Sequence, residues 1–267
     1  MEKVGEGREA EVFAWGEGRV LRLLRDPAAT GHLEREATAL AAAAAAGAPV
    51  PAPGELVTVD GRPGLVMERV DGPDALTLLG RRPWTFLATA VQLGELHAAL
   101  HACPAPRELP ELRADLRARI GSSPRVPARV ARAALERLDE LPAGDCLCHG
   151  DLHPGNVIVT AAGPRIIDWT NAVRGDPMAD VAWTGLLFRL ARPQPSAPFA
   201  VRRLDWVGRH AMYRRYLAAY ARRRPLDRAR VAHWQLVLAA ARLTKDIRDE
   251  RERITAVIEE SLRSYGL

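Results

Sequence analysis

The chain has 267 residues, of which 48% are hydrophobic and 27% are charged, a composition typical of globular proteins. That length suits one large domain or two lobes around a shared cleft. No segment approaches the roughly 20 consecutive apolar residues of a membrane helix. The first residues do not form a secretory signal, and the 3 cysteines do not suggest a disulfide framework. We therefore expect a cytoplasmic protein without a membrane partner.

The first seventy residues alternate short apolar runs with turn residues and include one longer helical segment. Two pairs of strands, each joined by a short glycine-containing turn, are predicted to form hairpins. Thr30 is expected to cap the helix, and Gly47 followed by Pro49 to end it. The predicted elements are strands at 10–15, 20–24, 56–59 and 65–70 and a helix at 30–46.

The turn residues Asp71-Gly72-Pro73 interrupt the chain, and the sequence after them becomes mainly helical. Apolar residues recur near the helical period in several segments. We therefore predict an α+β, bilobal fold with a β-rich small lobe at residues 1–70 and a mainly helical large lobe at residues 71–267. The large lobe is predicted to contain helices at 87–101, 109–120, 130–141 and from 180 onward, a loop at 193–198, and a strand–loop–strand segment at 146–167.

The most informative segment is HGDLHPGN at residues 149–156, followed by IIDW at residues 166–169. Asp151, Asn156 and Asp168 have the order and spacing that phosphoryl transfer from a nucleotide needs. One carboxylate takes the proton of the attacking hydroxyl, while an amide oxygen and a second carboxylate hold magnesium. A glycine- and proline-rich turn would account for part of the segment. It would not account for two histidines and two aspartates beside apolar runs.

This segment resembles the aminoglycoside phosphotransferase and choline kinase family, the small-molecule kinases with the protein-kinase-like fold. The resemblance implies Mg²⁺-dependent transfer of the γ-phosphate of ATP or GTP to a hydroxyl of a small molecule, such as an antibiotic or a metabolite. It makes Asp151 the catalytic base and Asn156 and Asp168 the magnesium ligands. His149 is a second candidate at the catalytic centre, where it would brace the loop, and Asp180 either supports that loop or caps a helix.

The small lobe contains several candidates for nucleotide binding. Gly5 and Gly7 begin a G-x-G-x-x-A pattern that fits a loop over phosphates or an ordinary glycine turn. Arg22 stands where the family carries a lysine, which is a departure from its pattern. Arginine keeps the positive charge and can bind phosphate or carboxylate with two parallel bonds. Val20 shares a strand face with Arg22 and could contact adenine.

Glu36 is the expected partner that orients this cation, although a solvated helix acid is the alternative interpretation. The resemblance also places the backbone groups of Glu68 and Val70 at a hinge that would bond the purine. Two other classes stay open beside the small-molecule kinase. The first is a nucleotide-binding regulatory pseudokinase that has little transfer activity, a possibility to which Arg22 points. The second is a protein kinase, for which no segment that docks an extended peptide is evident.

The acceptor, the choice between ATP and GTP, the oligomeric state and the role in resistance or metabolism do not follow from the sequence. Residues 189–230 contain 12 arginines against Asp205 and Asp227. Their helical spacing favours a solvated helix face over a nucleic-acid site, and we expect no nucleic-acid partner. This basic stretch fits a neutral, bulky or anionic acceptor at least as well as a cationic one. The aromatic residues nearby are more typical of core than of a pocket: Trp183, Phe188, Trp206, Tyr213, Tyr216 and Trp234.

Overall fold

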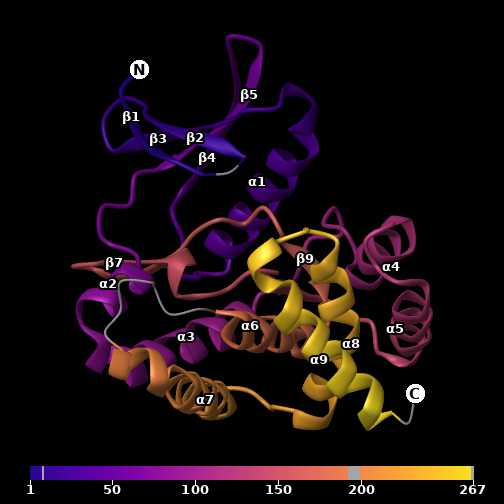
Figure 1. Ribbon diagram of the computed structural model, residues 1–267. Helices are drawn as coiled ribbons and strands as arrows, with labels where there is room; N and C mark the ends of the chain where they lie inside the picture. The colour runs from indigo at the N-terminus through magenta and orange to yellow at the C-terminus, as the bar shows by residue number, and fades with distance from the viewer. Residues whose placement is uncertain (8, 192–198, 266–267) are drawn as a thin grey trace.

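The computed structural model describes residues 1–7, 9–191 and 199–265, except for the side chains of residues 199–206. The loop predicted at 193–198 lies outside the described residues. A five-stranded sheet with one helix forms the N-terminal part, and a larger, mainly helical part lies below it (Figure 1). The predicted α+β arrangement of a β-rich part followed by a helical part is therefore present.

The sheet is antiparallel throughout and has the strand order β1-β2-β3-β5-β4. Alternation along β3 buries Leu21 and Leu23 on one face, so Val20 and Arg22 point to the other face, toward the helical part. The strand β1 was not predicted, because its four residues, three of them exposed, carry no apolar alternation. The strands are β1 Lys3–Glu6, β2 Ala10–Ala14, β3 Arg19–Leu24, β4 Pro53–Val59 and β5 Arg62–Glu68.

The helix of the N-terminal part, α1 (Thr30–Ala45), ends near the predicted position, and Gly47 follows with a φ of 76°. The prediction that Thr30 caps this helix was wrong. Pro27 starts a 3-10 turn one step earlier, and Asp26 caps that turn by accepting the N–H of Ala28. Thr30 is consequently already helical, and its hydroxyl donates to the carbonyl of Pro27.

The helical part is built from long helices and short strand pairs. Helix α3 packs closely against α7 at Gly94, since a Cβ at this glycine would lie 2.4 Å from the carbonyl oxygen of Tyr216. No described helix has the length and apolar composition needed to cross a bilayer. The elements are α2 Ala75–Arg81, α3 Phe86–Leu100, α4 Leu112–Ser122, α5 Ala128–Glu140, β6 Cys146–Cys148, β7 Val157–Thr160, β8 Gly163–Ile166, β9 Val173–Gly175, α6 Pro177–Leu190, α7 Phe199–Ala221, α8 Arg228–Leu243 and α9 Arg251–Ser264.

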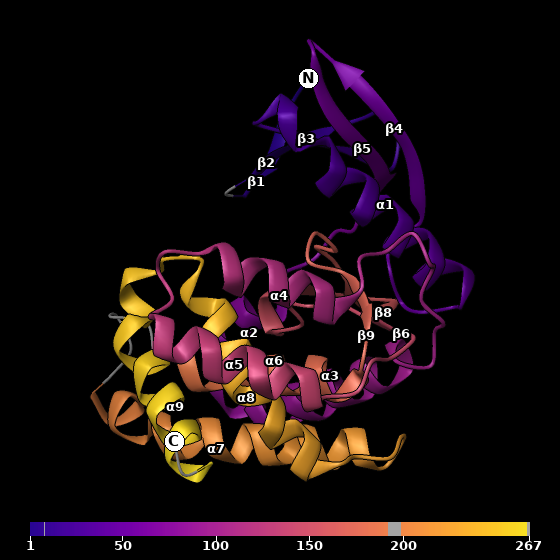
Figure 2. The ribbon, with the colours of Figure 1, turned by 90° about the vertical axis from the view of Figure 1, so that its right-hand side faces the viewer.

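The two parts share one apolar core. Ala39, Leu40 and Ala43 on α1 are buried in the same cluster as the helices of the larger part. Figure 2 shows α1 descending from the sheet toward α4 and β8, which is consistent with this shared packing. A smaller cluster that includes Leu24, Leu33 and Leu65 holds the strands to the first turns of α1. Another cluster, which includes Leu21, Leu23 and Val66, contains no residue of α1.

The β7–β8 hairpin is bonded to two connecting segments, the one from α1 to β4 and the one from β5 to α2. The N–H of Val159 donates to the carbonyl of Pro73 at 2.9 Å, and the N–H of Ile166 donates to the carbonyl of Pro49 at 2.8 Å. Gly72 has a φ of 154°, and a Cβ there would lie 2.3 Å from the carbonyl oxygen of Val159. Only glycine allows this close approach.

Candidate active site

The loop that contains Asp151 follows β6 and leads into β7, on the side of the helical part that faces the sheet. Gly150 has a φ of 74°, and a Cβ at this position would lie 2.2 Å from the carbonyl oxygen of Asn171. A glycine is therefore required immediately before Asp151. The loop ends in a 3-10 turn, Pro154–Asn156, that Pro154 begins.

Asp180 holds this loop from below. Its carboxylate accepts the N–H of His149 at 2.6 Å and the N–H of Gly150 at 2.9 Å. The alternative interpretation of Asp180 as a helix cap is wrong. The cap of α6 is Asp176, whose side chain accepts the N–H of Met178, and Asp180 lies in the first turn of the helix.

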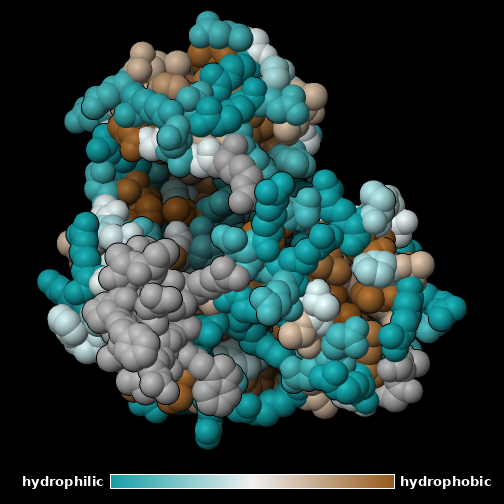
Figure 3. All heavy atoms as spheres, in the orientation of Figure 1, coloured by the Kyte–Doolittle hydropathy of each residue, from teal (hydrophilic) through white to brown (hydrophobic). Residues whose placement is uncertain are grey.

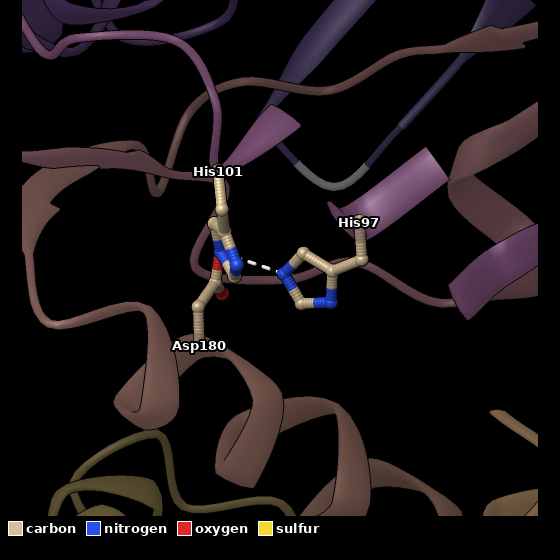
Figure 4. Close-up of side chains that lie close together, drawn as sticks. All are labelled: His97, His101 and Asp180. Carbon is tan, nitrogen blue, oxygen red and sulfur yellow. Dashed lines mark hydrogen bonds and ion pairs between the residues drawn. The ribbon is translucent and has the colours of Figure 1, made fainter. Parts of the chain in front are cut away.

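His97 of α3 and His101, which directly follows that helix, also converge on Asp180 (Figure 4). The Nε2 atoms of His97 and His101 lie 3.0 and 3.3 Å from its Oδ2. Asp180 and both imidazoles are buried. Burial opposes the negative charge of Asp180, but the neighbouring imidazoles hold its pKa well below its usual range.

Hydroxyl groups of α7 complete this network. The Tyr216 hydroxyl lies 2.6 Å from Nδ1 of His97, and the Tyr220 hydroxyl lies 2.9 Å from Nδ1 of His101. Burial lowers the pKa of His101 to about 4, so its ring is neutral near neutral pH. In the neutral form, Nε2 donates to Asp180 and Nδ1 accepts from tyrosine. Hydrogen bonds account for both ring nitrogens of His101 and for Nδ1 of His97. Nε2 of His97 lies close to Asp180 without a hydrogen bond, and the three groups could also hold a cation geometrically.

His149 has the same bracing character and does not line the cleft. Its side chain is fully buried, with Nε2 at 3.0 Å from the carbonyl oxygen of Ile167. The N–H of Asp151 donates to its Nδ1 at 3.3 Å, and its ring lies 4.8 Å from that of Trp169. Burial lowers the pKa of His149 and keeps the ring neutral. His149, a predicted residue of the catalytic centre, thus supports the loop from beneath and does not face the cleft.

Asp151 is the carboxylate of this loop that lines the cleft. Within the described part of the chain, its side chain accepts one hydrogen bond, from Trp183 Nε1 at 3.3 Å. Asn156 lies beneath it, 8% exposed, and its Nδ2 donates to the carbonyl of Asp151 at 3.0 Å. That bond leaves Oδ1 of Asn156 as the oxygen that can take a cation.

Asp168 follows β8 in a left-handed conformation, with a φ of 63°. Such a conformation is uncommon for residues other than glycine and is found frequently at functional sites. Its side chain is 45% exposed, and Oδ1 accepts the Thr170 hydroxyl at 2.5 Å. Partial burial alone would raise its pKa, but Thr170 and the charge of Arg22 hold the pKa of Asp168 below its usual value.

Arg22 and Glu36 form an ion pair that joins β3 to α1. The distance from Arg22 Nη1 to Glu36 Oε2 is 2.6 Å, and Nη2 donates to Thr170 at 3.2 Å. Arg22 Nη2 also lies 3.9 Å from Asp168. Burial raises the pKa of Glu36 to about 7, against the lowering effect of Arg22. The interpretation of Glu36 as a solvated helix acid is wrong, because the residue is 2% exposed.

A cleft of about 770 Å³ separates the two parts of the molecule, and Figure 3 shows it as a hollow beneath the sheet. Gly5 lines it from β1, where it pairs with Val12, and Gly7 lines it from the turn after β1, where its N–H donates to the carbonyl of Ala10. Val20 lines it from β3. The glycine turn is therefore placed over the cleft.

The hinge candidates lie at the back of the same cleft. The N–H of Glu68 is taken by the carbonyl of Ala52 at 3.0 Å, and its carboxylate accepts the N–H of Ala52. The Val70 N–H donates to no acceptor within the described residues. A ligand in the cleft could therefore bond the N–H of Val70, whereas the N–H of Glu68 is already occupied.

Three residues at this site had no local signal in the sequence. Trp183 bonds Asp151 from α6, while Arg242 and Lys245 line the cleft from the end of α8 and the segment after it. Trp183 is 5% exposed, so the expected core position of this aromatic residue is correct. The Trp206 side chain lies outside the described residues.

The fold, with this site between its two parts, belongs to the kinase-like phosphotransferases. Residues 1–234 match the phosphotransferase enzyme family. The match covers most of the 267 residues, so the chain belongs to that family. It is therefore a nucleotide-dependent small-molecule kinase, and the resemblance of its catalytic loop predicted the family correctly.

Solved structures of similar fold support the same placement. A thermostable mutant of aminoglycoside phosphotransferase APH(4)-Ia, in complex with ADP and hygromycin B, is 20% identical, with a TM-score of 0.64 over 96% of this chain and 92% of that chain. Amicoumacin kinase hAmiN, with AMP-PNP, Ca²⁺ and Ami, is 15% identical, with a TM-score of 0.65 over 97% and 87%. Macrolide 2'-phosphotransferase MphH from Brachybacterium faecium is 23% identical, with a TM-score of 0.57 over 96% and 90%. The predicted bilobal, kinase-like fold is confirmed, whereas a search of curated proteins gave no match.

Proposed function

We propose that this chain transfers the γ-phosphate of ATP or GTP to a hydroxyl group of a small molecule in a Mg²⁺-dependent reaction. The observation that carries the proposal is the state of Asp151. Its backbone is fixed by the buried Asp180 and His149, while its carboxylate faces the cleft with one long hydrogen bond from Trp183. A rigid carboxylate with free acceptor capacity is suited to orient an attacking hydroxyl and to take its proton.

Asn156 and Asp168 are the residues that would hold magnesium. An amide oxygen and a carboxylate are hard oxygen donors, which is the ligand chemistry that Mg²⁺ prefers. The low pKa of Asp168 keeps it ionised near neutral pH. When bound, magnesium neutralises charge on the phosphates. Asn156, directly before β7, and Asp168, shortly after β8, would hold the magnesium ion at the open end of this hairpin.

The nucleotide is proposed to bind against residues 1–70 and the acceptor against residues 71–267. Arg22, oriented by Glu36, would contact phosphate, and the turn at Gly5 and Gly7 would cover it. Val20 would contact the base, and the backbone N–H of Val70 and the carbonyl of Glu68 would bond it. In the similar structures of the APH(4)-Ia enzyme and hAmiN, a nucleotide is bound together with an antibiotic.

The alternative function is a regulatory pseudokinase that binds a nucleotide without transfer. Arg22 in the place of the family's lysine favoured that alternative, but it forms the ion pair with Glu36 that a phosphate-binding cation needs. Asp151, Asn156 and Asp168 are all present as well. These features favour the kinase, and the following experiment distinguishes the two.

The test is thermal unfolding with ATP and with GTP, each with and without magnesium, followed by detection of nucleoside diphosphate release. Binding at about 100 times the dissociation constant adds roughly 2.7 kcal/mol of stability. Asp168→Asn should remove the magnesium-dependent part of this shift, because asparagine tolerates the left-handed backbone but lacks the charge. Asp60→Asn is the matched control, since Asp60 is also left-handed (φ 52°) but lies in the distant β4–β5 turn. A shift that does not depend on magnesium or on Asp168 would contradict the proposal.

A further inference from the structure

The segment that follows α8 forms the wall of the cleft on the side of the helical part. Arg242, Lys245 and Ile247 line the cleft together with Asp151. In Figure 1 the connection between α8 and α9 reaches the top of the helical part, beneath the sheet. The Trp183 side chain, which bonds Asp151, lies on the same side, with the Arg242 guanidinium 5.8 Å from its ring.

The two cations of this wall differ in how their charge is balanced. Arg242 forms two hydrogen bonds with Glu250, at 2.8 and 2.9 Å, so its charge is compensated within the protein. Lys245 donates to the neutral Oδ1 of Asn171 at 3.3 Å and forms no ion pair among the described residues. Its side chain is half-buried. Lys245 is therefore a partly desolvated cation that lines the same cleft as Asp151 and has no carboxylate of the described residues within ion-pair distance.

The charge around Lys245 supports this description. Burial lowers the pKa of Lys245, Asp151 acts against that effect, and Arg242 and Arg119 add to it. Holding an ammonium group in such a place costs free energy unless an anion offsets it. An anionic ligand would supply the missing partner.

Two acidic side chains of this segment are paired: Glu250 is bonded to Arg242, and Asp246 lies 3.4 Å from Arg125. Asp249, the third, is exposed and does not line the cleft. The other acids that line the cleft, apart from Asp151 and Asp168, come from the sheet part or its connection: Glu6, Glu9, Glu36, Glu68 and Asp71. The described residues of the helical wall thus offer a polycationic acceptor no free carboxylate beyond those two.

The direction of transfer places Lys245 on the side of the acceptor. The attacking and leaving oxygens lie roughly in line in phosphoryl transfer, so the acceptor approaches Asp151 from the side opposite the nucleotide. The sheet side already has its own phosphate-binding candidate, Arg22. We propose that Lys245 forms an anion subsite beside Asp151 that binds a carboxylate or phosphate group of the acceptor. This inference rests on the proposed function and makes the acceptor a hydroxylated acid rather than a polycationic aminoglycoside.

The first experiment measures binding without turnover. Inorganic phosphate and gluconate are the anionic probes, glucose is the neutral probe and glucosamine the cationic probe, each titrated against the protein with AMP-PNP and magnesium bound. We expect thermal stabilisation by the two anions and none by glucosamine. Lys245→Gln should weaken phosphate binding about tenfold or more, the loss expected for a charge-assisted hydrogen bond. Lys245→Arg should restore it, and Lys3→Gln, which removes the other lysine, should have no effect.

The alternative is that Lys245 binds the γ-phosphate of the nucleotide and not an anionic group of the acceptor. The affinities of ADP and AMP-PNP for Lys245→Gln distinguish it, because only AMP-PNP carries the γ group. Equal affinities for wild type and variant support the acceptor subsite, and a selective loss for AMP-PNP overturns it. Glucosamine binding in place of gluconate, or phosphate binding that is unchanged in Lys245→Gln, also overturns it. If no nucleotide binds the wild type, the proposed function itself fails. That result differs from failure of the subsite alone, in which the nucleotide binds but the anionic probes do not depend on Lys245.

Discussion

Asp151 belongs to the loop between β6 and β7 and Asp180 holds that loop, but their carboxylates are in opposite situations. Asp180 is 3% exposed, accepts two backbone N–H groups and lies against two imidazoles. Asp151 faces the cleft and has one bond, from Trp183. The acceptor capacity of Asp180 is used up by the protein, whereas that of Asp151 is open to a ligand. The comparison separates the carboxylate that holds the structure from the one available for chemistry.

The largest effect is expected for Asp151→Asn. It keeps the size of the side chain and the Trp183 contact but removes the proton acceptor. We expect the rate of phosphate transfer to fall by about 10²- to 10⁴-fold, with nucleotide affinity retained. A coupled assay of nucleoside diphosphate release, alongside thermal shift with the nucleotide, measures both. Normal transfer by this variant would contradict the role of Asp151.

Asp180→Asn should act mainly on stability. An asparagine amide turns a donor toward groups that already donate, so buried N–H groups of the loop lose an acceptor. Breaking a buried charged network by removing one partner costs about 3–5 kcal/mol, which urea unfolding would detect. Asp145→Asn is the control, because Asp145 pairs with Arg174 at the surface and should change stability by no more than about 0.5 kcal/mol. Equal stability of the two variants would remove the contrast between Asp151 and Asp180.

Glu36 should give the protein a pH-dependent stability. Its folded-state pKa is raised from 4.5 to about 7, so the folded state binds the proton more tightly than the unfolded state. The stabilisation is fully present below pH 4.5 and is lost as pH rises through about 7; it amounts to at most about 3 kcal/mol. Glu36→Gln should flatten this dependence in urea unfolding across that range, and Glu34→Gln, on the exposed face of α1, should not. A dependence that persists in Glu36→Gln belongs to another group.

Arg22→Lys should have the smallest effect. Lysine keeps the positive charge beside Glu36 but gives up the simultaneous contact with Thr170. We expect the KM for the nucleotide to rise by less than about tenfold, a difference below 1.4 kcal/mol. Steady-state kinetics with Arg22→Gln as the uncharged comparison measure it. If lysine is as damaging as glutamine, the guanidinium makes a paired contact that charge alone cannot replace.

The sequence was sufficient to predict those parts of the candidate site whose residues are close together along the chain. The HGDLHPGN string and the following IIDW contain the loop, Asn156 and Asp168 within one strand–loop–strand segment, and their spacing is enough to indicate the family. The antiparallel hairpins of the sheet followed from alternation and turn residues in the same local way. Arg22 and Glu36 were paired by resemblance, and β3 and α1 bring them to 2.6 Å.

The support beneath the loop could not be found in the same way. His97 and Tyr216 are 119 residues apart, as are His101 and Tyr220, and they meet because α3 packs on α7. Lys245 reaches the cleft through the turn after α8, which no local pattern places beside Asn171. β1 was missed because it is short and exposed, and the cap of α1 because Asp26 begins a turn of its own before the helix.

The β7–β8 hairpin has a mechanical consequence for closure of the cleft. Pro73, which leads from the sheet to the helices, and Pro49, which leads from α1 to β4, are both bonded to it. Asn156 lies immediately before this hairpin, and Asp168 stands just after it. A rotation of the sheet against the helices would therefore turn about this hairpin. Both proposed metal ligands lie at its open end, where Val157 pairs with Ile166, so the metal position would move little as the cleft opens and closes for its ligands.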